Sequence, residues 1–212
     1  MTLILTALCK NGICVCADTR YQLKNDSRLV ENKDGNHKIY KFDSDDISLI
    51  IFNHGINNIN GKGWKTFCSD YTKSYQWKNK KLDQVAEGFK LFIENDIQKE
   101  LQRNKIDHTI GFVLCGKTIY DNDFDVYELW WDPDYSFIHL ENEAIIKTGN
   151  GKTCLDDYFK NNSELNTKEF WKSKNTSEAQ KELEKLFKVA VKERNRLNRN
   201  DFSDDYNTEC IK

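Results

Sequence analysis

The sequence predicts an α+β protein that folds as a four-layer αββα sandwich, with residues 1–212 forming a single domain. The predicted elements run in the order strands, two helices, strands, two helices and a final strand. Each of two sheets needs one face covered, and each helix pair can cover one sheet. No linker, internal repeat or low-complexity tract divides the chain, and its length suits one domain with a substantial core.

The first twenty residues predict a β-hairpin. Two short apolar runs flank Asn11-Gly12, and this dipeptide between apolar runs is a strong hairpin signal. Asp18 closes the second run, and Thr2 directly follows Met1. If Met1 is removed, Thr2 carries both a hydroxyl and a free amine, which makes it a nucleophile with its own base.

The next hundred residues predict strands followed by two helices. Residues 21–33 are polar and predict an irregular segment, and a short strand is expected at 37–42. The continuous apolar run at 47–55 is typical of a strand buried on both faces. Apolar residues at helical intervals then predict helices over 59–75 and 82–101.

The second half of the chain repeats this alternation. Strands are predicted at 109–115, 125–131, 135–140 and 144–148, with a turn at Pro133 between the second and third of them. A short helix is expected to follow Gly149-Asn150-Gly151, and residues 161–175 are polar and predict a loop. Ser177 and Gln180 are a candidate capping box for a long helix that ends near Leu197, before a final strand at 207–212.

Composition excludes several classes of protein. Charged residues make up 31% of the chain and hydrophobic residues 38%, with a net charge of −2, so the sequence indicates a soluble globular protein that binds neither nucleic acid nor membranes. No apolar run near the start is long enough to cross a bilayer, and the start lacks the features of a signal peptide. We therefore expect a cytoplasmic protein.

The cysteines and histidines do not indicate a metal site. The seven cysteines include no Cys-x-x-Cys pair, and most lie within apolar runs. They are expected to be buried free thiols in a reducing compartment rather than disulfides or zinc ligands. The four histidines are scattered, and neither a metal nor another cofactor is expected.

Thr2, Gly12 and the run Ala17-Asp18-Thr19-Arg20 resemble the start of proteasome β-type subunits and of the HslV peptidase, which are N-terminal-nucleophile hydrolases. The resemblance implies the same four-layer fold and threonine endopeptidase activity on peptides or unfolded proteins. It also implies a homo-oligomeric ring that encloses a chamber, with an ATPase unfoldase as a candidate partner.

The same resemblance implies roles for a catalytic set. Lys38 would lower the pKa of the Thr2 hydroxyl through its charge, and Asp18 would hold Lys38 in place. Four more residues separate Asp18 from Lys38 than in the family, and Lys33 and Lys41 are the competing lysines. The free α-amine, with an ordinary pKa of about 7.7–8.0, would accept the hydroxyl proton.

Three further residues complete the expected site. The backbone N–H of Gly55 would donate to the oxyanion. Asn150 stands where the family has a serine that bonds near the threonine amine, and Asp201 is the nearest match to an acid that follows the last long helix, with Asp204 next.

Two alternatives to a peptidase stay open. A structural or binding subunit of the same fold without activity is favoured by His54, which replaces a small residue before Gly55, and by Asn150 in place of serine. An amidase that acts on a small amide would share the nucleophile, and only substrate tests would separate it from a peptidase.

The first testable prediction concerns Met1. Because threonine is small enough for methionine aminopeptidase to act before it, the mature protein should begin at Thr2. Intact-mass measurement on protein purified from its own host checks this. A mass that includes Met1 would leave the Thr2 nitrogen as an amide without basicity and would contradict the catalytic interpretation.

Overall fold

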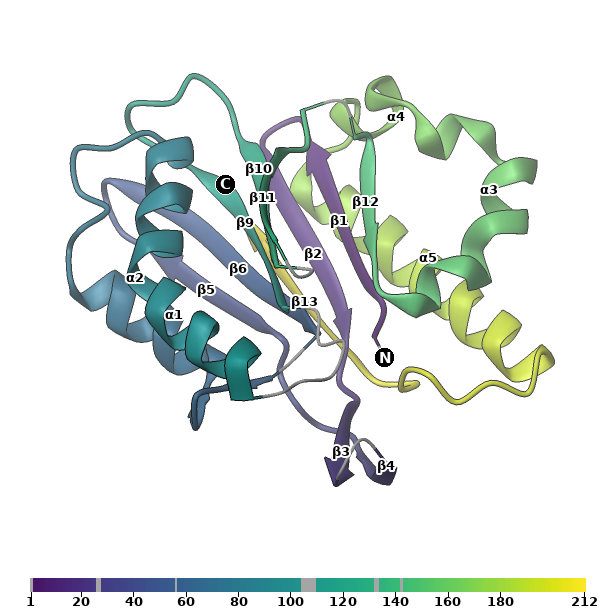
Figure 1. Cartoon of the computed structure of the whole chain (residues 1–212). Coiled ribbons are helices and arrows are strands. Elements are labelled where there is room, and N and C mark those ends of the chain that lie inside the picture. Colours follow the sequence, from purple (N-terminus) through teal and green to yellow (C-terminus); the bar gives the residue numbers. More distant parts are fainter. Residues whose placement is uncertain (1, 26–27, 56, 104–109, 132–133, 142) are drawn as a thin grey trace. The chain divides into compact units, whose positions relative to one another are not determined.

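The computed structural model describes residues 2–25, 28–55, 57–103, 110–131, 134–141 and 143–212. The chain divides into two compact units, the first made of Met1–Ile39 and Asn142–Lys212 and the second of Tyr40–Glu141. Each unit combines antiparallel strands with helices, which confirms the predicted α+β class (Figure 1). The predicted Pro133 turn and the start of the strand expected at residue 109 lie outside the described residues.

The first unit contains a four-stranded antiparallel sheet, in which the predicted N-terminal hairpin supplies the two central strands. The sheet order is β12 (Ile145–Thr148), β1 (Ile4–Cys9), β2 (Gly12–Asp18) and β13 (Tyr206–Ile211). Every residue of β2 is buried, as its apolar sequence predicts. Strands that are distant in sequence, β12 and β13, therefore flank a hairpin formed by local pairing.

The hairpin turn lies at Lys10-Asn11, one residue earlier than predicted. Gly12 already pairs with Cys9 in the ladder. Glycine is needed at position 12 because a Cβ there would lie 1.9 Å from the carbonyl oxygen of Ile211 on β13. Close approach of the neighbouring strand, rather than the turn, explains this glycine.

Helices cover one face of this sheet (Figure 1). The longest, α5 (Thr176–Arg196), buries an apolar stripe that includes Leu183 and Phe187 against β1 and β2. Its capping box is formed by Asn175 and Glu178, so the predicted box of Ser177 and Gln180 was wrong. The turn residue Asn11 accepts a hydrogen bond from the backbone N–H of Thr176 at 3.0 Å, which fixes the start of α5 on the hairpin.

Shorter helices precede α5. The segment after β12 forms the 3₁₀ helix η1 (Asn150–Leu155) and α3 (Asp156–Asn161). Residues 161–175, predicted as a loop, instead contain η2 (Ser163–Asn166) and α4 (Lys168–Lys172). The buried Trp171 ring holds them together, since its Nε1 donates to the carbonyl of Leu165 at 2.8 Å.

The polar segment predicted as irregular forms a second hairpin in the first unit. Its strands are β3 (Tyr21–Asn25) and β4 (Arg28–Lys33), and their register shifts between Leu23 and Lys24. Residues 21–33 are mostly polar, which is why the sequence predicted an irregular segment there.

The second unit contains a five-stranded antiparallel sheet, in the order β11 (Tyr135–His139), β10 (Asp125–Trp131), β9 (Ile110–Thr118), β6 (Ile47–Gly55) and β5 (Ile39–Asp43). One face is covered by α1 (Trp64–Lys73) and α2 (Leu82–Arg103), as predicted (Figure 1). Aromatic rings dominate this core; the rings of Phe89 and Phe112 meet edge to face with centroids 5.2 Å apart.

The first helix of the second unit starts later than predicted. Residues 58–63 form the small hairpin β7 (Asn58–Ile59) and β8 (Lys62–Gly63). The residues between these strands, Asn60 and Gly61, both have positive φ, a conformation that excludes a helix there. Apolar spacing had extended the helix through Ile59, which is buried in the hairpin instead.

One cysteine prediction is corrected. Cys14 on β2 and Cys210 on β13 are direct register partners, with Cα atoms 4.2 Å apart, and form a disulfide. The other cysteines are free and buried, as expected: Cys9, Cys16, Cys68, Cys115 and Cys154. Burial raises the pKa of the Cys16 thiol to about 12, which makes it unreactive at neutral pH.

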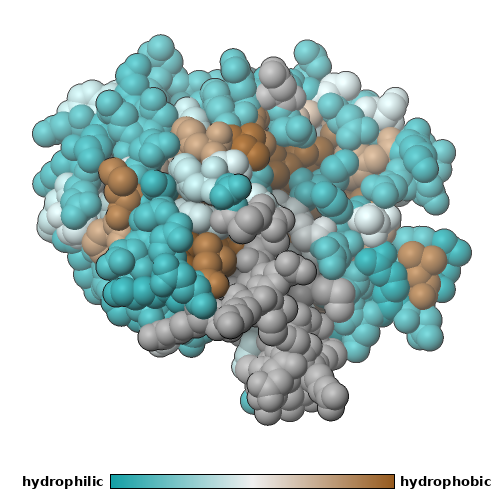
Figure 2. All heavy atoms as spheres, viewed as in Figure 1, coloured by the Kyte–Doolittle hydropathy of each residue, from teal (hydrophilic) through white to brown (hydrophobic). Residues whose placement is uncertain are grey.

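Surface character agrees with the composition. The face of the molecule seen in Figure 2 is mostly hydrophilic. Among the helices that the structure describes, none is long and apolar enough to cross a membrane.

Candidate active site

Thr2 and Asp18 lie at the same end of the N-terminal hairpin. Thr2 precedes β1, Asp18 ends β2, and the backbone N–H of Asp18 donates to the carbonyl of Leu3 at 3.0 Å. In this register the Thr2 hydroxyl donates to Asp18 Oδ1 at 2.5 Å, and the Leu3 N–H donates to the same oxygen at 2.9 Å. The hairpin therefore brings a hydroxyl and a buried carboxylate into direct contact.

Lys38 completes a three-residue cluster. It lies immediately before β5, and its Nζ donates to Thr2 Oγ1 at 2.7 Å and to Asp18 Oδ1 at 2.8 Å. The side chain of Lys38 is 4% exposed and that of Asp18 is fully buried. Burial lowers the pKa of the Lys38 ammonium, and the Asp18 charge opposes this effect.

The competing lysines lie elsewhere. Lys33 is exposed at the end of β4. Lys41 forms an ion pair with Asp43 at 3.1 Å within the second unit. Of the three lysines that the sequence proposed, Lys38 is the one that contacts Thr2 and Asp18.

The Gly149-Asn150-Gly151 turn holds the main chain of Thr2. The backbone N–H of Gly151 donates to the Thr2 carbonyl at 3.1 Å. Gly149 has φ of +89°, and a Cβ on it would lie 2.2 Å from the same carbonyl oxygen. Asn150 is exposed and its carbonyl accepts a hydrogen bond from Arg199, so the role expected for its side chain stays a prediction.

Asp201 belongs to the same network as this turn. Its buried carboxylate forms an ion pair through Oδ2 with Arg199, which also reaches Thr153 Oγ1 at 2.8 Å. Its Oδ1 is buried without a hydrogen-bond partner among the described residues. Asp204, the other candidate acid, is exposed and pairs with Arg194 at the end of α5.

Gly55 lies in the other unit, at the end of β6 with φ of +91°. Its expected role as an oxyanion donor stays a prediction. The preceding His54 is buried, stacks on Trp130 with ring centroids 4.5 Å apart, and lies 2.9 Å from Glu128 Oε1. Gly111 makes room for the His54 ring, because a Cβ there would lie 2.0 Å from His54 Cε1.

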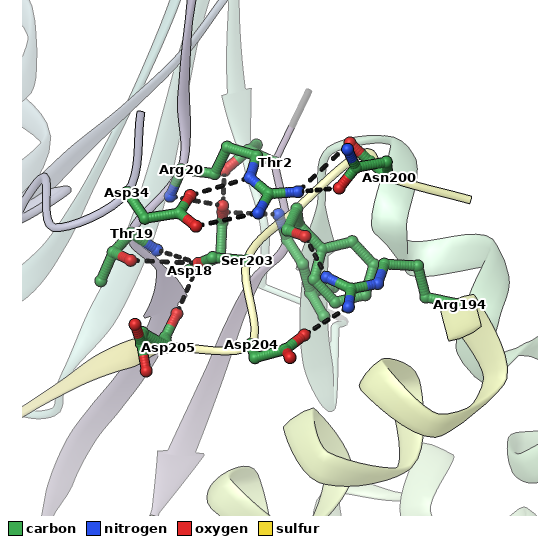
Figure 3. Close-up of polar contacts among 12 residues, drawn as sticks. Thr2, Asp18, Thr19, Arg20, Asp34, Arg194, Asn200, Ser203, Asp204 and Asp205 are labelled. Carbon is green, nitrogen blue, oxygen red and sulfur yellow. Dashed lines mark hydrogen bonds and ion pairs between the residues drawn. The ribbon is translucent and has the colours of Figure 1, made fainter. Parts of the chain in front are cut away.

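The structure adds residues that the sequence analysis missed. Asp18 Oδ2 accepts the backbone N–H of Arg20 at 3.0 Å, so both carboxylate oxygens are occupied. The buried Ser203 hydroxyl accepts from the Thr19 N–H at 2.9 Å and donates to the Asp205 carbonyl at 2.6 Å (Figure 3). A lone serine in a polar tail carries no periodic or motif signal.

Among the residues that the structure describes, no three His, Cys, Asp or Glu side chains are grouped so as to hold a metal ion. The cluster instead combines a hydroxyl, an ammonium and a carboxylate, which together can polarise the hydroxyl for attack on a carbonyl carbon.

The sequence matches no protein-family model and no curated protein. Solved structures do match over 98–99% of this chain and 80% of theirs. They include a Gly-1 mutant of Anbu from Hyphomicrobium sp. strain MC1 (13% identity, TM-score 0.64) and Anbu, described as an ancestral beta-subunit, from Yersinia bercovieri (10%, 0.63). A third is the helical assembly of the Anbu complex from Pseudomonas aeruginosa (12%, 0.61). The chain has the fold of Anbu.

This finding corrects the family assignment. The first hairpin resembles proteasome β-type subunits and HslV, whereas the similar solved structures are Anbu proteins. The residues behind that assignment, from Thr2 to Arg20, cover only the first hairpin and the two residues after it. A stretch of this length predicts a hairpin but is too short to identify a family.

A stability prediction follows from the buried pair. Replacing Lys38 with Met leaves the Asp18 carboxylate buried without its cation, and we expect a loss of about 3 kcal/mol in the free energy of unfolding. The double variant Asp18→Asn with Lys38→Met should recover part of this loss. Lys41→Met, which breaks an exposed pair, should change stability by less than about 1 kcal/mol.

Urea denaturation of the four proteins measures these differences. If Lys38→Met and Lys41→Met lowered the free energy of unfolding equally, Asp18 would not depend on Lys38 as a buried counter-charge, and the prediction would be wrong.

Proposed function

We propose that the chain is a threonine-type peptidase whose nucleophile is Thr2 after removal of Met1. The observation that supports this most strongly is the contact of the buried Lys38 ammonium with Thr2 Oγ1 at 2.7 Å, braced by Asp18 at 2.8 Å from the same ammonium. A buried cation on a hydroxyl oxygen stabilises the alkoxide and so lowers the pKa of the hydroxyl.

In the proposed reaction, Thr2 Oγ bonds to the carbonyl carbon of a peptide while its proton passes to the freed Thr2 amine. The carbonyl electron pair moves to oxygen, where the backbone N–H of Gly55 would donate. The C–N bond then breaks, and the departing amine takes the proton. Water attacks the resulting ester in the second half of the cycle and regenerates the hydroxyl.

The residues of the Gly149-Asn150-Gly151 turn and Asp201 would support Thr2 indirectly, through its main chain and the surrounding hydrogen bonds. Gly151 and Gly149 fix the Thr2 main chain, which would hold its amine in a constant position. Among the residues that the structure describes, none donates a hydrogen bond to the buried Oδ1 of Asp201, so this oxygen could accept one during the reaction. Asn150 enters the proposal through its backbone carbonyl and its place in the turn, since its side chain is exposed.

We further propose that both units form one four-layer αββα domain over residues 1–212, that it assembles into a homo-oligomeric ring, and that it degrades peptides or unfolded proteins in the cytoplasm. The likeness to Anbu over 98% of the chain supports the fold, and the helical assembly of the Pseudomonas aeruginosa Anbu complex supports association of subunits. An ATPase unfoldase would be needed if the substrates were folded proteins.

A subunit without activity is the second candidate. It is favoured by His54, whose large ring stacks on Trp130 next to the glycine proposed as oxyanion donor. An amidase for small amides would use the same cluster and would differ only in substrate.

The mechanism predicts the order of effects in a variant series assayed with short fluorogenic peptides. Thr2→Ala should abolish activity without unfolding the protein, because it removes one hydroxyl near a chain end. Thr2→Ser should retain part of the activity. Asp18→Asn and Lys38→Ala should each lower kcat strongly, and Thr2→Ala combined with Lys38→Ala should be little worse than either alone, since the residues act as one unit.

Full activity of Thr2→Ala would overturn the proposal. Hydrolysis of small amides without cleavage of any peptide would favour the amidase instead.

Association is tested by sedimentation. At micromolar concentration the protein should sediment as an oligomer, whatever the salt concentration between 50 and 500 mM (roughly 4 to 14 Å of Debye length). A monomer under all these conditions, and at several pH values, would contradict an enclosed-chamber peptidase.

A further inference from the structure

Asp34 forms an ion pair with Arg20 next to the Thr2 cluster. Its two carboxylate oxygens accept from Arg20 Nε and one terminal guanidinium nitrogen, each at 2.8 Å (Figure 3). The side chain of Asp34 is 39% exposed and that of Arg20 is 13% exposed. Bidentate pairing of this kind fixes the orientation of both groups more tightly than a single contact.

Arg20 is also held from two other directions. Its backbone N–H donates to Asp18 Oδ2 at 3.0 Å. Its remaining terminal nitrogen donates to the side-chain oxygen of Asn200, in the segment that follows α5 (Figure 3). Arg20 is therefore held in a fixed position beside the Asp18 carboxylate, which binds Lys38.

The segment Asp34–Lys38, here called the lysine segment, is attached to Arg20 and to the neighbouring residue Thr19. Asp34 anchors one end through Arg20, and the backbone N–H of Asn36 donates to the carbonyl of Thr19 at 2.9 Å. Gly35, between these two anchors, has φ of +88°. Four residue steps span at most about 14 Å, so the position of Asp34 limits where Lys38 can lie.

The charge of Asp34 also favours the protonated form of Lys38, which is the form that donates to Thr2 and Asp18. Burial lowers the pKa of Lys38, whereas the charges of Asp18 and then Asp34 raise it and that of Arg20 lowers it. Without the Asp34 carboxylate, the opposing Arg20 charge is no longer balanced. Loss of Asp34 should therefore lower the pKa of Lys38 further.

We propose that Asp34 is a positioning residue for Lys38, which it holds against Thr2 and Asp18 by clamping the lysine segment onto Arg20. The inference rests on the proposed function for its effect on peptide cleavage, though its effect on Lys38 itself does not.

A merely structural surface pair would behave differently. Exposed ion pairs contribute little to stability, and breaking one leaves distant side chains unaffected. The matched control is Asp157→Asn on α3, which removes the exposed carboxylate that pairs with Lys160 at 3.1 Å in the same unit.

The kinetic test compares Asp34→Asn, Asp34→Glu, Arg20→Gln, the double variant Asp34→Asn with Arg20→Gln, and the control. Asp34→Asn should lower kcat about tenfold with little change in KM, and the alkaline limb of its pH profile should move to lower pH. Asp34→Glu should restore most of the activity, the double variant should be no worse than Arg20→Gln alone, and Asp157→Asn should match the parent.

The second test does not require activity. NMR titration of ¹³C-labelled lysine, with the Lys38 signal assigned from Lys38→Arg, should give a lower Lys38 pKa in Asp34→Asn than in the parent or in Asp157→Asn. An unchanged Lys38 titration together with unchanged kcat would overturn the inference. If Asp34→Asn fails to fold, Arg20→Lys replaces it, since it keeps the charge and loses the fork; it should lower kcat, and a parental value would overturn the inference.

The two tests also separate the inference from the proposed function. A shifted Lys38 titration in a protein whose Thr2→Ala variant keeps full activity would support the clamp and overturn the peptidase. Loss of activity in Thr2→Ala with an unaffected Asp34→Asn would do the reverse.

Discussion

The first unit depends on one buried ion pair, between Lys38 and Asp18. Both charges are removed from water, and each is tolerated only because the other is present. Asp18 meets this requirement fully: one oxygen accepts from Thr2, Leu3 and Lys38, and the other from the Arg20 backbone. The hairpin register and the lysine segment bring their groups to this carboxylate, and the turn at Gly149 holds the Thr2 main chain. The candidate nucleophile is therefore held partly by the contacts that neutralise a buried charge.

Much of this could be predicted because the signals are local. The apolar runs of β1, β2 and β6 and the amphipathic stripe of α5 are readable within a few residues, and Thr2 and Asp18 meet through the hairpin that joins them. Lys38 was predicted by resemblance rather than by physics, since nothing nearby in the sequence marks it. Asp34 and Ser203 were missed because isolated polar residues in loops produce no periodic pattern. Their partners, Arg20 and Thr19, are brought to them only by tertiary folding.

The predictions that were wrong share a physical origin. The N-cap residue of α5 is Asn175, two residues before Ser177, which had fitted the sequence motif of a capping box. Residues 161–175 fold into short helices around the buried Trp171 ring, and the sequence alone does not show what this ring packs against. The family assignment was wrong because the residues behind it describe one hairpin.

The disulfide between Cys14 and Cys210 has a topological consequence. The bond spans a sequence separation of 196, so nearly the whole chain lies inside one covalent loop, and Thr2 is on the short tail outside it. A single proteolytic nick in a surface loop between Cys14 and Cys210 would therefore leave a molecule of unchanged mass apart from one added water, with its fragments still joined. Damage of this sort would become visible only after the bond is reduced.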